Sequence, residues 1–386
     1  MEGLEATLRG LSLARRSRPE EPTYLLDAAL HPTGPLAVSC SDLSIRLHDR
    51  DTLTPLGAYR GHGGPVSGVV FPCGSSDLLY SGSADGTIRA WDTRRPGSDA
   101  AQTFRSDPTY SLCSFDLSGG DTLLCAGTEQ VNEEDSFLLF WDARKPGSGL
   151  LGAYSESHSD DITQVRFHPD DKDRLATGST DGLVNVFDLS RGGEEEALLA
   201  TCNSESSAGA LCWCGGTYTR LLCLSHDQGL HLWDLCHLDT DDPLLVFSAP
   251  DARALAPAPL DYLVGGRWLE HAQKLLVVGG RNDGELHLME CDEGGLGLLG
   301  TLRGGHTSTV RCFLWDAAGQ TLITGGEDSQ LLLWKPGGEE LMGGKKESRK
   351  SQSALRLKTR PRKKHGCRRE KEAAQTPDGN RGSVGN

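Results

Sequence analysis

Two landmarks recur seven times along the chain and keep a nearly constant distance from one another. The first ends an apolar segment, usually with an aromatic and then an acidic residue, at Asp49, Asp92, Asp142, Asp188, Asp234, Glu290 and Lys335. Successive copies are 43, 50, 46, 46, 56 and 45 residues apart. The second landmark ends an earlier segment, at Leu30, Phe71, Phe115, Phe167, Trp213, Trp268 and Trp315. Such a period indicates a repeat architecture in which each unit packs against its neighbours.

Each unit reads as a set of short strands joined by turns. In the second unit, residues 66–71 are rich in β-branched side chains, residues 78–83 are apolar, and residues 87–92 alternate before ending on Trp-Asp. Between the last two segments, Asp85-Gly86 fits a tight hairpin, because glycine readily adopts a positive φ. The chain has 48 glycines in 386 residues, which disfavours long helices. The sequence therefore predicts an all-β fold.

The units resemble WD40 repeats, whose signature is a Gly-His pair followed by a Trp-Asp ending. The Gly-His pair is intact in Gly61-His62 and Gly305-His306, and the resemblance covers roughly residues 23 to 336. It implies a seven-bladed β-propeller of four-stranded blades around a central channel. We predict that residues 1–22 close the last blade, that residues 23–338 form the propeller, and that residues 339–386 form a disordered basic tail.

The resemblance also implies a hydrogen-bond network in each complete blade. An indole N–H meets a hydroxyl, the hydroxyl meets an imidazole, and the imidazole meets a carboxylate. In blade 4, Phe187 takes the place of the indole, so His158, Thr177 and Asp181 form an incomplete set. Because the sets recur, we predict a structural role and not a catalytic triad. The two complete sets are His62, Ser81, Asp85, Trp91 and His306, Thr324, Asp328, Trp334.

Other motifs give no support to catalysis or to a bound group. Residues 295–300 satisfy G-x-G-x-x-G, but no helix is expected after them, which disfavours dinucleotide binding. Cys212 and Cys214 are not accompanied by a C-x-x-C pair elsewhere in the chain, which disfavours a structural zinc site. No apolar run approaches the length of a membrane span, and residues 1–21 do not fit a signal peptide. We expect an intracellular protein that is not an enzyme and has no cofactor, metal or membrane partner.

Charge divides the chain into two parts. Residues 1–344 carry a net charge of -25, and residues 345–386 carry +10. The acidic part predicts attraction to basic segments of other proteins. The basic part predicts import into the nucleus, with a cytoplasmic pool left open, and any nucleic-acid contact would use this tail alone. Its densest cluster is Lys358, Arg360, Arg362, Lys363, Lys364, Arg368 and Arg369.

Two tetrapeptides on adjacent units share the pattern W-D-x-R, and they end at Arg94 and Arg144. They resemble motifs with which WD40 substrate receptors of the cullin-four ubiquitin ligase contact its adaptor. Three functions therefore stay open. The chain is predicted to be a monomeric interaction scaffold within a complex; the alternatives are a ligase substrate receptor, and a nuclear factor that contacts RNA or ribonucleoprotein through the tail.

Overall fold

The computed structural model describes residues 2–337, apart from residues 20, 98, 133–134 and 239–241. The chain divides into two units, Met1–Met342 and Gly343–Asn386, and all the described strands lie in the first. The predicted disordered tail at residues 339–386 lies outside the described residues.

Within the described residues, 28 strands form seven four-stranded antiparallel sheets. Blades 1 to 3 comprise β2 (Leu25–Leu30), β3 (Leu36–Cys40), β4 (Ile45–His48), β5 (Pro55–Tyr59); β6 (Val66–Val70), β7 (Leu78–Ser83), β8 (Thr87–Asp92), β9 (Gln102–Arg105); and β10 (Leu112–Leu117), β11 (Leu123–Thr128), β12 (Leu138–Asp142), β13 (Gly152–Tyr154). Blades 4 and 5 comprise β14 (Gln164–Phe167), β15 (Arg174–Gly178), β16 (Leu183–Asp188), β17 (Leu198–Asn203); and β18 (Ala208–Cys214), β19 (Arg220–Ser225), β20 (Leu230–Asp234), β21 (Leu244–Ala249). Blades 6 and 7 comprise β22 (Tyr262–Leu269), β23 (Lys274–Gly280), β24 (Leu286–Asp292), β25 (Gly295–Leu302); and β26 (Val310–Asp316), β27 (Thr321–Gly326), β28 (Leu331–Pro336), β1 (Leu11–Ser17).

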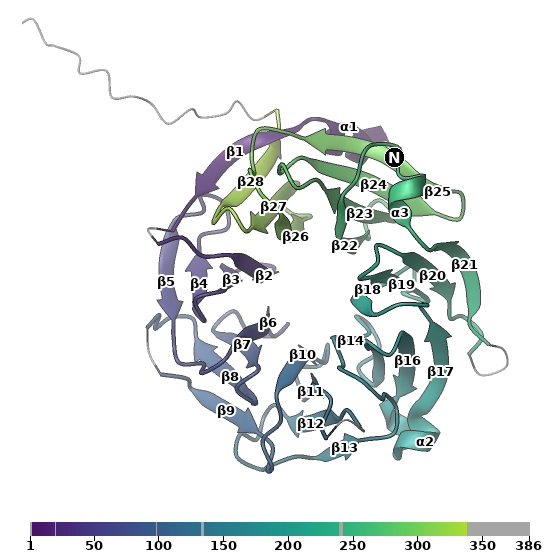
Figure 1. The fold of residues 1–386 in the computed structure, drawn as a ribbon. Helices are drawn as coiled ribbons and strands as arrows, with labels where there is room; N and C mark the ends of the chain where they lie inside the picture. The colour runs from purple at the N-terminus through teal and green to yellow at the C-terminus, as the bar shows by residue number, and fades with distance from the viewer. Residues whose placement is uncertain (1, 20, 98, 133–134, 239–241, 338–386) are drawn as a thin grey trace, which may run out of the picture. The chain divides into compact units, whose positions relative to one another are not determined.

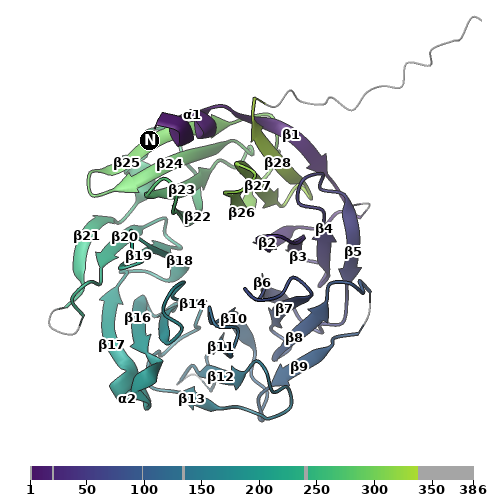
Figure 2. The ribbon, with the colours of Figure 1, turned by 180° about the vertical axis from the view of Figure 1, so that it is seen from behind.

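The seven sheets stand in a ring around a central opening, each with its first strand innermost (Figure 1; Figure 2 shows the ring from behind). The prediction of a seven-bladed, all-β propeller is confirmed. The second strands are among the most buried; all five residues of β3, for example, are 0% exposed. Such strands are mostly apolar because neighbouring blades cover both of their faces, and their polar side chains are buried with them.

The last blade contains both ends of the propeller. Its outer strand is β1, which pairs antiparallel with β28, and Leu13 lies opposite Trp334. The short helix α1 (Glu2–Arg9) precedes β1, and Leu8, Leu11 and Leu13 are buried in one cluster with Trp334. Pairing the first strand with the last closes the ring, so that no blade is left with an uncovered face.

Because strand direction alternates within a blade, the connections emerge at two rims. We call the upper rim the one that carries the turns between second and third strands and the links from blade to blade. The lower rim carries the turns between first and second and between third and fourth strands. The remaining helices are η1 (Leu189–Arg191), α2 (Glu194–Ala197) and α3 (Ala252–Leu255). Among the helices of the described residues, none has the length and apolar character needed to cross a membrane.

Residues 295–300, which fit the dinucleotide pattern, lie within the outer strand β25 of blade 6. Their backbone is hydrogen bonded to β24, with Gly297 opposite Glu290. The glycines are therefore part of a sheet and do not form a phosphate-binding loop.

Candidate functional site

The structure brings together all four members of each complete hydrogen-bond set. In blade 2, the indole N–H of Trp91 on β8 donates to Ser81 Oγ on β7 at 2.8 Å. His62, from the link that enters the blade, places Nε2 2.8 Å from Ser81 Oγ and Nδ1 3.0 Å from Asp85 Oδ2. In blade 7, His306, Thr324, Asp328 and Trp334 repeat this arrangement, with distances between 2.8 and 3.1 Å.

Burial argues against catalysis by these groups. Ser81 and Thr324 are both 0% exposed, so no substrate reaches either hydroxyl. Burial is the largest influence on Asp85 and opposes its ionisation, but hydrogen bonds from Thr87, Gly63 and His62 outweigh it and lower its pKa to about 2. Burial also lowers the pKa of His62. At neutral pH this set therefore contains an ionised Asp85 and a neutral His62. The buried polar atoms of the set form hydrogen bonds with one another.

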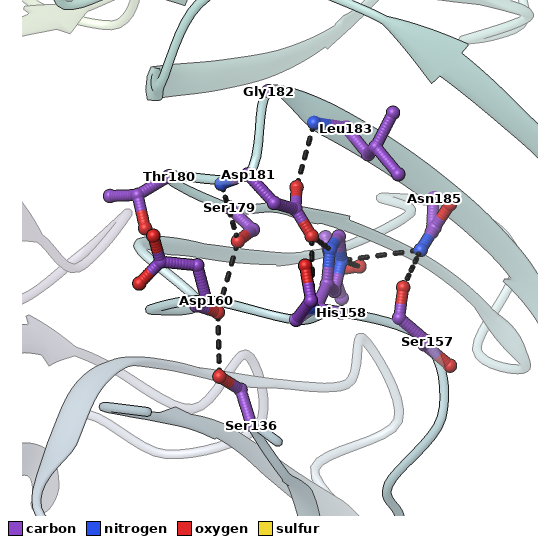
Figure 3. A network of polar contacts seen from close by, with 12 residues as sticks. Ser136, Ser157, His158, Asp160, Ser179, Thr180, Asp181, Gly182, Leu183 and Asn185 are labelled. Carbon is purple, nitrogen blue, oxygen red and sulfur yellow. Dashed lines mark hydrogen bonds and ion pairs between the residues drawn. The ribbon is translucent and has the colours of Figure 1, made fainter. Parts of the chain in front are cut away.

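Blade 4 completes its network with a residue that the sequence analysis missed. His158 lies 3.0 Å from Asp181 Oδ2 and 2.8 Å from Thr177 Oγ1, as in the other blades. Asn185 on β16 places Nδ2 3.4 Å from His158 Nε2 and donates to the carbonyl oxygen of Ser157 at 2.6 Å (Figure 3). The sequence does contain a signal for this role, because Asn185 is a polar residue between Val184 and Val186 in an otherwise apolar segment.

Carboxylates on two innermost strands join consecutive blades. Asp27 on β2 accepts the backbone N–H of Val69 at 3.0 Å, and Asp116 on β10 accepts that of Phe167 at 2.8 Å. Burial is the main influence on both side chains and raises the pKa of each. These two links fix the inner edges of blades 1 and 2 and of blades 3 and 4.

Arg94 and Arg144 occupy matching positions on the lower rim of adjacent blades. Each arginine donates from Nε at 2.8 Å and from Nη2 to the aspartate two residues earlier, Asp92 or Asp142. Arg94 also pairs with Asp77 at 3.2 Å. Their side chains are 65% and 64% exposed. The two guanidinium groups are therefore accessible and are held in the same geometry by their own chain.

Charge on the upper rim is uneven. In blades 6, 7 and 1, acidic residues of this rim form ion pairs, such as Glu285 with Arg303 at 2.9 Å and Asp42 with Arg60 at 3.0 Å. On blades 3 to 5, at least six acidic residues of this rim have no ion pair with any described residue, and four of these six are exposed. We call this set the acidic arc: Glu129, Asp135, Glu156, Asp160, Asp161 and Glu205.

Two kinds of site receive no support from the geometry. Within the described part of the chain, no group of three His, Cys, Asp or Glu side chains is arranged to hold a metal ion. The basic cluster between Lys358 and Arg369 lies outside the described residues, so its predicted role stays a prediction.

Comparison with known proteins gives the family. A family model described as "WD domain, G-beta repeat" matches residues 53–92, 151–188 and 297–335. A "WD repeat-containing protein 89 homolog" of Dictyostelium discoideum is 28% identical over 82% of this chain and 83% of its own. The "WD repeat-containing protein GTS1" of Arabidopsis thaliana is 31% identical over 78% of each chain. The chain belongs to the WD-repeat family.

The matched segments of this WD-repeat protein are those with a His-hydroxyl-Asp set, in blades 2, 4 and 7. A chain in a crystal structure of the mitotic checkpoint complex shares the fold, with a TM-score of 0.67 and 15% identity, over 84% of this chain and 91% of its own. WD40 propellers are generally interaction scaffolds without catalytic activity.

The indole hydrogen bond can be tested with a matched pair of substitutions. Trp91→Phe removes the N–H that donates to Ser81, whereas no hydrogen bond from the Trp233 indole is found among the described residues. We expect Trp91→Phe to lower the free energy of unfolding by about 1–2 kcal/mol more than Trp233→Phe, because a buried hydroxyl loses its donor. Urea unfolding followed by circular dichroism measures both, and equal losses would contradict the structural role.

Proposed function

We propose that the protein is a non-catalytic interaction platform in an intracellular, nuclear complex, and that the acidic arc receives a basic segment of a partner protein. The proposal rests on the uneven distribution of ion pairs among the acidic residues of the upper rim. Glu285, Glu327 and Asp42 on blades 6, 7 and 1 are each paired with an arginine, while the carboxylates of the arc have no such partner.

Long-range electrostatics supports the same partner class. Residues 1–344 have a net charge of -25, so a basic segment is attracted from a distance and oriented before contact. The exposed carboxylates keep most of their hydration, so the desolvation cost of pairing is small. Association by this route weakens as salt is added, because a Debye length of about 8 Å at physiological ionic strength screens the field.

Hydrogen bonds between blades 3 and 4 hold the arc in place. Gln130 donates its backbone N–H to Asp161 Oδ1 at 2.8 Å and its side-chain amide to the carbonyl oxygen of Ser159 at 2.6 Å. Ser136 Oγ donates to the carbonyl oxygen of Asp160 at 2.6 Å (Figure 3). Loops fixed in this way lose little conformational freedom on binding, which favours affinity.

We expect the paired substitution Glu129→Gln and Glu156→Gln to weaken binding of a lysine- and arginine-rich peptide about fivefold at 50 mM salt, since two exposed charges are lost. Fluorescence anisotropy with a labelled peptide measures the dissociation constant. The control, Asp251→Asn with Asp283→Asn, removes the same charge from carboxylates of this rim that are already ion-paired. Equal weakening by both pairs would show that net charge matters and the arc does not.

The nuclear part of the proposal depends on the basic tail, whose net charge is +10. Deleting residues 345–386 should remove nuclear accumulation of a fluorescent fusion, because clustered Lys and Arg residues are the signal for import. Nuclear signal that persists in the truncated protein would contradict this role, and unchanged RNA co-purification would also argue against an RNA contact by the tail.

A second candidate function is that of a ligase substrate receptor, and it is favoured by the matching exposure and geometry of Arg94 and Arg144. Changing both to Ala should abolish capture of a ligase adaptor in proximity labelling, while other neighbours are retained. Arg191→Ala is a control on the lower rim of blade 4. If neither the intact protein nor the variants label an adaptor, this function is wrong.

A further inference from the structure

A cavity of about 410 Å³ opens between blades 5 and 6 on the lower rim, opposite the rim of the acidic arc. It is bounded by the turn between β18 and β19, the end of β20, the turn between β22 and β23, and the end of β24. These two blades lie side by side in both views of the ring (Figures 1 and 2). The volume of the cavity is in the range of sites that hold a small ligand or one or two side chains.

The charges around this cavity leave an excess of carboxylates. Arg220 in its wall is held by Glu293 at 2.8 Å and Asp234 at 3.4 Å. Lys274 is held by Glu290 at 2.6 Å and Glu5 at 2.8 Å.

Asp234 and Glu290 line the cavity, and so does a third carboxylate, Asp292; it accepts the backbone N–H of Gly294 and has no ion pair with a described residue. The lining therefore holds two cations, Arg220 and Lys274, and three carboxylates, a net charge of -1. Hydrogen bonds to Glu290 and Glu5 raise the pKa of Lys274, so both cations stay charged and are already neutralised by their neighbours.

The remaining part of the cavity lining is apolar. Leu232 and Leu275 are buried in its wall, Trp268 is half-buried, and Cys214 and Cys291 complete the apolar lining. An aromatic ring close to a carboxylate suits a side chain with an aliphatic stem and a cationic head. Such a side chain would rest its stem on Trp268 and place its head towards the carboxylates of the lining.

We propose that this cavity binds an arginine or lysine side chain from a basic segment of a partner polypeptide. This assigns a second site to the lower rim, formed by residues other than the acidic arc. It rests on the proposed function only in the basic character of the partner.

The test follows the tryptophan in the cavity wall. The full-length protein is labelled with 5-fluorotryptophan, and the Trp268 resonance is assigned among the seven tryptophans by the loss of one signal in Trp268→Phe. The probe is the capped peptide Ser-Gly-Arg-Gly-Ser, and its matched control carries citrulline, which has nearly the shape of arginine without its charge. We expect a saturable shift of the Trp268 resonance with the arginine peptide and no saturable shift with the citrulline peptide.

Substitutions separate this site from the acidic arc. Asp292→Asn keeps the acceptor for Gly294 and should raise the dissociation constant of the arginine peptide about fivefold, as expected for losing one exposed charge at the cavity. Glu129→Gln with Glu156→Gln should leave the Trp268 titration unchanged within twofold.

A Trp268 shift that is the same for citrulline, or a dissociation constant unaffected by Asp292→Asn, would overturn the cavity assignment. If peptide binding is then lost only in the arc variant, the proposed function stands without the second site. If neither variant weakens binding, both are wrong.

Discussion

The packing of consecutive blades against one another is the interaction on which the structure depends. A four-stranded sheet of this size has two apolar faces and cannot bury either alone. One core cluster shows the arrangement: Ala37, Ile45 and Leu47 of blade 1 are buried together with Leu79 and Trp91 of blade 2. Because every such interface needs a neighbour on each side, the fold is stable only as a complete ring, and the polar groups on these faces must be satisfied within the blades.

The hydrogen-bond networks follow from that requirement. Where His, a hydroxyl, Asp and Trp are all present, as in blades 2 and 7, the network is closed. In blade 4 the indole is absent, and the Asn185 amide occupies a place beside His158. Thr201 on the next strand in turn donates to Asn185 Oδ1 at 2.7 Å. Different residues therefore meet the same demand, which explains why the sequence signature varies between blades while the geometry of the blades is kept.

The fold could be predicted from the sequence because the residues that identify each repeat lie close together in the sequence. Landmarks such as Trp91 and Trp334, and turns such as Asp85-Gly86, are set by neighbours within about 50 residues of sequence. The interaction surfaces depend on contacts between blades. Arg220 and Glu293 at the lower-rim cavity are 73 residues apart, and Lys274 pairs with Glu5 across 269 residues. The three-dimensional structure likewise decides which carboxylates of the upper rim form ion pairs. The amino-acid composition gives only the total number of acidic residues.

The placement of β1 beside β28 has a consequence for biosynthesis. Leu8, Leu11 and Leu13 are synthesised before the strand they pack against, which is completed about 320 residues later. At typical rates of 5–20 residues per second, this leaves the first strand without its partner for roughly 15–60 s. During that time an apolar, hydrogen-bonding edge is open to other nascent chains. The ring therefore closes only after β28 has been made, and until then β1 has no partner strand within the chain.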